Sequence, residues 1–251
     1  EMAKLKHVQP RTEDARSRFG DDSDERNPTF FLRELLILPD LSRRETSLVV
    51  IDDDFPFGVE YLSSTSFREI NFGQLVAVGQ RHSIAGKNLR IRGFEICRSC
   101  GKVQQGPARA NNHTWSCRFR DKPDDAQLRN LMFIYREFSS EALRFLLPGV
   151  NFWDESGQPS FLGALHLGLK NHFGGKVNHL QSSIGEEPQP DSRQRKTFLY
   201  LYDSIPGGSG YLRQLIESGG NDLRSVYKKS LMAMKTCRCG DGCYRCIFQY
   251  R

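Results

Sequence analysis

Four cysteines within a ten-residue run limit most strongly what this sequence can fold into. The run is Cys237-Arg-Cys239-Gly-Asp-Gly-Cys243-Tyr-Arg-Cys246. Its loops are short and rich in glycine, which lets the backbone fold all four sulfurs round one point. Tetrahedral zinc held by four thiolates needs that arrangement and leaves no open position. We therefore predict a structural zinc site that fixes the end of the preceding helix; free buried cysteines or an iron–sulfur cluster are the alternatives.

A second cysteine cluster lies near the middle of the chain. Cys97, Cys100 and Cys117, together with His113, give the spacing Cys-x2-Cys-x12-His-x3-Cys. Three thiolates and one imidazole are a common zinc ligand set. This reading uses all seven cysteines, an odd number that argues against a complete set of disulfides. In the alternative reading, His113 is a surface residue and the fourth ligand is water or absent.

Composition narrows the class of protein. The 251 residues are 38% hydrophobic and 26% charged, which allows one large domain or two small ones. No apolar run approaches the ~20 residues of a membrane span, and no signal peptide opens the chain. With metal-type cysteine spacing, this predicts a cytoplasmic protein without a membrane partner. The net charge of +6 fits a nucleic-acid partner, although many basic proteins bind none.

The pattern of apolar residues predicts an α+β fold in three parts. Residues 1–28 are polar and read as a linker. Residues 29–125 read as a small antiparallel, strand-rich part that carries the three-cysteine, one-histidine zinc knuckle. Residues 126–251 read as an α/β zinc-binding domain that ends in the four-cysteine site. The strands expected in the second part cover residues 47–51, 74–78 and 89–92.

The elements of the third part follow from turn residues and helical spacing. Residues 128–147 are ambiguous, and we favour strands broken near Ser139 and Ser140. Ser160 is a good N-cap for a helix that Gly174 and Gly175 end. The remaining predictions are a polar loop over 185–196, a buried strand over 198–202, and helices over 211–217 and 223–234.

A glycine-rich turn, Pro206-Gly207-Gly208-Ser209-Gly210, joins that strand to the next helix. Its backbone N–H groups are candidates for contact with a nucleic-acid phosphate. The alternative is a tight connection in which Asp203 or Ser209 caps the helix. No Lys-Ser or Lys-Thr pair follows the glycines, so the turn is not a nucleotide P-loop.

Other polar residues carry weaker signals. His172 and His179 could belong to a cryptic nuclease, but no acidic or nucleophilic partner stands at a telling spacing, and we assign no catalytic triad. Basic side chains are candidates for phosphate contact, although a single cation is usually only solvated. The main candidates are Arg193, Arg195, Lys196, Lys228 and Lys229, with Arg118, Arg120 and Lys235 beside them.

Taken together, these motifs resemble a known family. The sequence is similar to the C-terminal zinc-binding region of a group of superfamily 2 DEAD/DEAH-box helicases, which includes mitomycin-repair helicases and bacterial anti-phage defence helicases. The most specific motifs of this resemblance are Tyr202-Asp-Ser-Ile-Pro-Gly-Gly-Ser-Gly-Tyr-Leu212 and the four-cysteine run. The resemblance covers about residues 29–251; softer matches lie at 67–73, 97–101, 136–144, 160–165, 173–175 and 179–180.

The resemblance implies that the four C-terminal cysteines bind zinc. It also implies that the region packs against two helicase motor lobes and guides a nucleic-acid strand. We expect this strand to be DNA and keep RNA as the alternative. The sequence has no Walker A motif, so this chain by itself is not expected to hydrolyse ATP, and we expect it to be part of a longer polypeptide. The alternative function is a protein-interaction scaffold of a defence complex that touches no nucleic acid.

Overall fold

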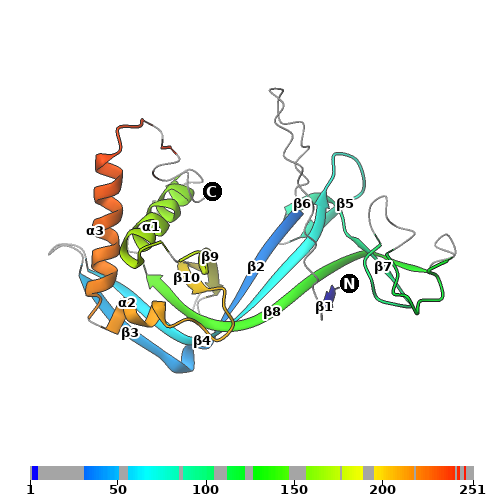
Figure 1. The fold of residues 1–251 in the computed structure, drawn as a ribbon, viewed down its shortest axis with the longest axis horizontal. Coiled ribbons are helices and arrows are strands. Elements are labelled where there is room, and N and C mark those ends of the chain that lie inside the picture. The colour runs from blue at the N-terminus through cyan, green and yellow to red at the C-terminus, as the bar shows by residue number, and fades with distance from the viewer. Residues whose placement is uncertain are drawn as a thin grey trace. The chain divides into compact units, whose positions relative to one another are not determined.

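The chain divides into two compact units, each assembled from separate stretches of sequence. In this computed structural model, one unit comprises residues 1–36 and 68–137 and the other residues 37–67 and 138–251. Strands β2, β4 and β8 contribute residues to both (Figure 1). The boundaries predicted near residues 28 and 125 stay a prediction. The structure describes residues 2–4, 31–50, 56–84, 87–104, 112–121, 127–146, 157–175, 177–188, 195–217, 219–240, 242–243 and 246.

The first unit is built from short strands around the first half of β8 (Leu128–Leu146). β7 (Phe94–Cys97) pairs antiparallel with β8, and β1 (Met2–Lys4) pairs with it in parallel. β6 (Lys87–Arg92) pairs antiparallel with the end of β4 (Pro56–Leu75), and β5 (Arg81–Ile84) pairs with β6. The core of its described residues is small and includes three clusters: Phe72 with Ile91, Phe94 with Met132 and Ile134, and Cys97 with Cys117 and Phe119.

One strand prediction fails in this unit. The expected polar linker, or tethered surface segment, over residues 1–28 includes strand β1 at Met2–Lys4, where Lys4 Nζ donates to Glu137 Oε2 at 2.6 Å and Ala3 packs on the core. The strand expected over 74–78 ends at Leu75. Val78 is 87% exposed, and Gly79 takes a φ of +140° that leaves the strand direction.

The second unit packs helices on an antiparallel sheet. β10 (Arg195–Asp203) pairs with β8 and with β9 (Leu180–Pro188), and β3 (Arg44–Val50) pairs with β4 after the short 3-10 helix η1 (Leu41–Arg43). α1 (Gly157–Phe173) and α3 (Asn221–Thr236) lie side by side, and α2 (Tyr211–Glu217) precedes α3 (Figure 1). The sheet with its few helices confirms the α+β prediction. The core includes Leu143, Leu165, Leu169, Leu201, Leu212 and Leu223.

Strand β8 is continuous where we predicted a break at Ser139 and Ser140. Both serines find partners from a distant turn: Ser140 Oγ donates to the carbonyl of Ile205 at 2.7 Å, and Ser139 O accepts from Gly207 N at 2.8 Å. Polar residues whose groups are bonded in this way do not interrupt a strand. The break prediction was therefore wrong.

Three element boundaries also differ from the prediction. α1 begins at Gly157 rather than at Ser160, since a proline such as Pro159 is tolerated in a helix's first turn. The expected polar loop over 185–196 is partly strand, because Arg195 and Lys196 pair with Pro188 and Glu187. The helix expected over 223–234 extends to Asn221–Thr236, while the helix over 211–217 is confirmed.

A buried ion cluster joins β4, β8 and β9. Arg144 is 5% exposed; its Nε donates to Glu60 Oε2 and its Nη1 to Glu187 Oε2, both at 2.6 Å. Glu187 also accepts from the hydroxyl of Tyr200. Two carboxylates around one guanidinium offset its loss of hydration.

Within the described residues, none of the helices has both the length and the apolar character needed to cross a membrane.

Candidate metal centres and nucleic-acid interface

The four C-terminal cysteines form one compact cluster of sulfur atoms. Sγ of Cys237 lies 3.2 Å from that of Cys239 and 3.5 Å from that of Cys243. Sγ of Cys246 lies 3.5 Å from that of Cys239 and 3.7 Å from that of Cys243. Tetrahedral zinc with Zn–S bonds of ~2.3 Å places its sulfurs about 3.8 Å apart. A disulfide needs about 2.05 Å, so the sulfurs are gathered without being bonded to one another.

The surroundings of the cluster favour a cation at its centre. The neighbouring thiols, Cys237 first and then Cys246, raise the pKa of Cys239 to about 12, because one sulfur cannot ionise readily beside others. A bound divalent ion reverses this, since it stabilises all four thiolates together. The N–H of Cys243 donates to Sγ of Cys246 at 3.1 Å, a backbone bond typical of thiolate sites. The donor set therefore fits zinc.

Helix α3 delivers the first sulfur of this cluster. It ends at Thr236, and Cys237 is its C-cap, with a backbone N–H that donates to Met234 O at 3.2 Å. Gly242 then takes a φ of +96°, which a side chain would disfavour, just before Cys243. A helix that leads straight into the cluster places the metal and the helix end in one rigid piece.

The second group of ligand atoms lies in the first unit. The Nδ1 atom of His113 is 3.5 Å from Sγ of Cys100 and 3.4 Å from Sγ of Cys117, and Sγ of Cys97 is 4.0 Å from that of Cys117. His113 is only 5% exposed, so it is not the surface residue of the alternative reading. Within the described residues, these two tetrads are the groups of histidine, cysteine and acid positioned to hold a metal ion.

Ionisation in the second group is uneven. Burial opposes it at Cys100, but hydrogen bonds from the backbone of Thr114 and Lys102 and from His113 outweigh burial and lower the pKa of Cys100 to about 6. Burial raises the pKa of Cys97. A ready thiolate beside an imidazole is a favourable starting point for zinc, which then deprotonates the remaining thiols.

The glycine-rich turn is closed by a buried carboxylate. Asp203, fully buried at the end of β10, accepts from the backbone N of Ile205 at 2.8 Å and of Ser209 at 2.7 Å, and from the Ser209 hydroxyl. These bonds hold the turn tightly against the strand from which it leaves. These bonds fit the alternative interpretation of the turn, in which it is a tight connection organised by Asp203.

A second buried carboxylate reaches the same turn from β8. Glu141 Oε1 accepts from Gly210 N at 2.8 Å, and Oε2 accepts from the Tyr61 hydroxyl at 2.9 Å. The N–H of Gly207 donates to Ser139 and that of Gly208 to Ile205. The amides that we expected to meet a phosphate are thus donors to protein atoms. Phosphate contact by Gly207, Gly208 and Ser209 stays a prediction, and it would have to use other groups.

The predicted cations differ in their surroundings. Lys228 on α3 is exposed, whereas Lys229 is half-buried and its Nζ donates to the carbonyl of Asn171 on α1 at 3.3 Å. Nζ of Lys196 lies 5.6 Å from the centre of the Phe198 ring. Arg193 and the side chain of Arg195 lie outside the described residues.

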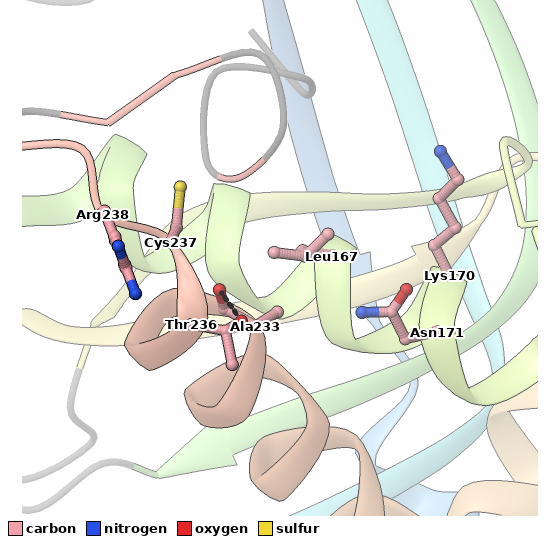
Figure 2. Close-up of a pocket in the computed structure, with 7 residues that line it drawn as sticks. All are labelled: Leu167, Lys170, Asn171, Ala233, Thr236, Cys237 and Arg238. Atoms are coloured by element: carbon pink, nitrogen blue, oxygen red, sulfur yellow. Dashed lines mark hydrogen bonds between the residues drawn. The ribbon is translucent and has the colours of Figure 1, made fainter.

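A cavity of about 560 Å³ lies between α1 and α3 beside the four-cysteine cluster. Figure 2 shows Arg238 and Cys237 at one end and Lys170 with Asn171 at the other. Cationic side chains at both ends suit an anionic ligand. Lys170 and Arg238 were not among the cations that the sequence analysis predicted to contact phosphate. The sequence held one indication for Arg238, its position between two cysteines of the predicted zinc site.

The two histidines of the nuclease hypothesis are separated by aromatic rings. His172 packs edge-on against Phe173, Phe173 against Tyr211, and Tyr211 against His179, with centroids 4.8, 4.7 and 5.2 Å apart. His179 Nε2 lies 3.2 Å from the Ser209 hydroxyl, and that hydroxyl donates to Asp203. The carboxylate thus bonds to the serine and not to the imidazole, which is the wrong order for activating a nucleophile.

Comparison with known proteins bears on this region. Residues 162–247 match the family model described as the MrfA Zn-binding domain. Among solved structures, the fold is similar to the crystal structure of the DUF1998 helicase MrfA bound to DNA, with a TM-score of 0.45 and 11% sequence identity over 87% of this chain. This chain spans 22% of the length of that one. No curated protein matches. The matched family binds zinc, which confirms zinc as the cofactor.

Proposed function

We propose that this chain is the accessory region of an ATP-dependent DNA helicase, because residues 162–247 match the family model of the MrfA Zn-binding domain. The observation that carries the proposal is the cluster of four sulfurs at the end of α3, inside the matched segment. Two closed metal centres have no open ligand position for catalysis. Their role is to hold a basic surface in shape while other parts of the helicase supply ATP hydrolysis.

The DNA contact that we propose is the cavity beside the cluster. Lys170 and Arg238 line it, and Lys229 bonds to the Asn171 carbonyl at its edge. We propose that these cations contact phosphates of the nucleic-acid backbone, and such contacts carry no sequence information, so binding would be largely independent of sequence. Cys237 also lines the cavity, so loss of zinc would disturb the contact.

A salt titration of binding tests this proposal. The full chain is titrated with fluorescent single-stranded and duplex DNA at several salt concentrations. We expect affinity to fall steeply with salt, and the double variant Lys170→Gln/Arg238→Gln to reduce the slope for single strands by about 1.4. Arg43→Gln, which neutralises an exposed cation on η1, is the matched control. Binding that does not depend on salt would overturn the proposal.

The remaining parts of the proposal concern the intact protein. There the region would pack on two motor lobes and work in a reducing cytoplasm, in bacterial phage defence. A pull-down with separately expressed motor lobes tests the packing, and phage plating on a deletion strain tests the setting. If the chain formed no complex with the lobes, the proposed packing would be wrong. If the deletion left the plating efficiency of phage unchanged, the proposed role in phage defence would be wrong.

A second candidate function is a protein-interaction scaffold. One observation favours it: Leu231, Met232 and Met234 of α3 are 47%, 65% and 38% exposed. Exposed apolar side chains on one helix suit a protein partner. If the chain bound no nucleic acid and captured the motor lobes or another subunit, this reading would replace the first.

A further inference from the structure

Trp115 is unusually exposed for a residue of its size. It lies in the knuckle, by which we mean residues 97–104 and 112–121, and 83% of its surface is accessible. Single exposed apolar residues are common on protein surfaces, so exposure alone says little. Trp115, however, is held between two candidate zinc ligands, His113 and Cys117. The indole therefore projects from the segment that links two ligands of the same candidate metal site.

The local backbone confirms that the indole sits on a tight turn. The N–H of Cys117 donates to the carbonyl of Thr114 at 3.0 Å, and the N–H of Arg120 donates to the carbonyl of Cys117 at 3.0 Å. These bonds fix the chain on both sides of the Cys117 ligand. A side chain presented from such a turn loses little further freedom when it meets a ligand, which favours affinity.

The charges around the indole select the class of ligand. Arg98, Lys102, Arg118 and Arg120 are all exposed, and Asp121 is the single acidic residue between positions 97 and 121. Within the described knuckle, Trp115 is the one large apolar side chain that is exposed. A protein interface seats its aromatic anchor in a well-packed, desolvated core, and the described knuckle offers no second exposed large apolar side chain to build such a core beside Trp115. One flat aromatic ring among cations is instead typical of sites where a base stacks and phosphates pair with arginine.

We infer that the knuckle binds single-stranded nucleic acid by stacking an unpaired base on Trp115, with neighbouring phosphates contacting Arg98, Arg118 and Arg120. Duplex DNA does not offer the face of a base, so the site would select single strands. The inference rests on the proposed function for its nucleic-acid partner. It adds a second site, in the other compact unit from the cavity beside the four-cysteine cluster.

Binding of fluorescent oligo-dT and of a duplex by the 251-residue chain tests the inference. We expect Trp115→Ala to weaken oligo-dT binding by about 5- to 150-fold, the loss expected for one base stack. Duplex affinity and the salt slope should stay as in the wild type, because no charge is removed. Trp115→Phe should retain most of the affinity, since a smaller ring still stacks. Equal zinc content in all variants shows that the knuckle remains folded.

The chain has two tryptophans, so the variant Trp153→Phe leaves Trp115 as the single indole reporter. We expect its fluorescence to be quenched by oligo-dT and unaffected by the duplex. Unchanged oligo-dT affinity of Trp115→Ala, with salt-dependent DNA binding intact, would overturn the inference alone. If Trp115→Ala lost affinity while Lys170→Gln/Arg238→Gln did not, the inference would stand and the cavity contact would fail. A chain that bound no nucleic acid would overturn both.

Discussion

The backbone nitrogen of Gly210 lies 2.8 Å from Oε1 of Glu141, a side chain that is 3% exposed and 69 residues away in the sequence. The glycine-rich turn is therefore shaped from inside by a carboxylate of strand β8. Asp203 holds the same turn at both ends, because it accepts from the backbone N–H groups of Ile205 and of Ser209. The N–H groups of Gly207 and Gly208 donate to the carbonyls of Ser139 and Ile205, so the amides of the turn are already bonded to protein atoms. Our proposal therefore places the DNA contact at the cations near α3.

Replacing Gly208 by alanine should destabilise the protein more than replacing Gly207. Both residues have a positive φ, +82° and +87°, so each alanine carries a similar backbone strain of about 1 kcal/mol. A Cβ on Gly208 would also lie 2.6 Å from Cγ of Glu141, whereas one on Gly207 meets nothing within 4 Å. We expect Gly208→Ala to lower the free energy of unfolding by about 1–3 kcal/mol more than Gly207→Ala. Urea unfolding of the two variants measures the difference, and equal losses would contradict it.

The purified chain should hold two zinc ions. Elemental analysis should show this stoichiometry, and Cys239→Ser or Cys100→Ser should each remove one ion, because each leaves an incomplete ligand set. Ser99→Ala, which changes an exposed residue between two ligands, should keep both. After chelation, all seven cysteines should react with a thiol reagent. Retention of both ions by either cysteine variant would show that the assigned ligands are wrong.

Replacing Gly168 by alanine should force α1 and α3 apart. A Cβ there would collide with Oγ of Ser230 and lie 2.5 Å from the carbonyl oxygen of Val226. Alanine favours a helix over glycine by about 1 kcal/mol, but overpacking should outweigh this and leave a net loss of about 2 kcal/mol in thermal unfolding. Adding Ser230→Ala should not restore stability, since the Val226 carbonyl remains. Asn171→Ala, at an exposed site of α1, is the control.

His166 should make stability fall in mild acid. Burial lowers the pKa of His166 from its ordinary value of 6.5. A group whose pKa is depressed in the folded state contributes stability above the ordinary pKa and loses it as the pH falls through that value. The variant His166→Gln, which can still bond to Ser182, should flatten the decline of unfolding free energy as the pH falls below about 6.5. Unfolding of both proteins is followed with saturating zinc. If their unfolding free energies fell in parallel with pH, His166 would not be the cause of the decline.

The parts of this molecule that the sequence predicts are those specified by neighbours along the chain. Cysteine spacing predicts both ligand groups, because ligands on short loops must converge. The helix over 211–217 follows in the same way from its apolar spacing. The continuity of β8 could not be predicted, since the partners of Ser139 and Ser140 come from residues 205 and 207.

The same reason accounts for what the sequence missed in the site. The N–H groups of the glycine-rich turn look available until Glu141 is placed beside them, and no local pattern predicts that meeting. The exposure of Trp115 is also a property of the folded knuckle. Aromatic residues in a sequence are more often buried than exposed, so its position alone carried no signal.

Cys237 directly follows the last residue of α3 and supplies one of the four sulfurs of the C-terminal cluster. Adding or deleting one residue between Ser230 and Cys237 would swing that sulfur by about 100° round the helix axis and out of the cluster. A substitution in this stretch can be accommodated, but a change of length cannot. Natural variants of this chain should therefore differ here in side chains and keep the same number of residues.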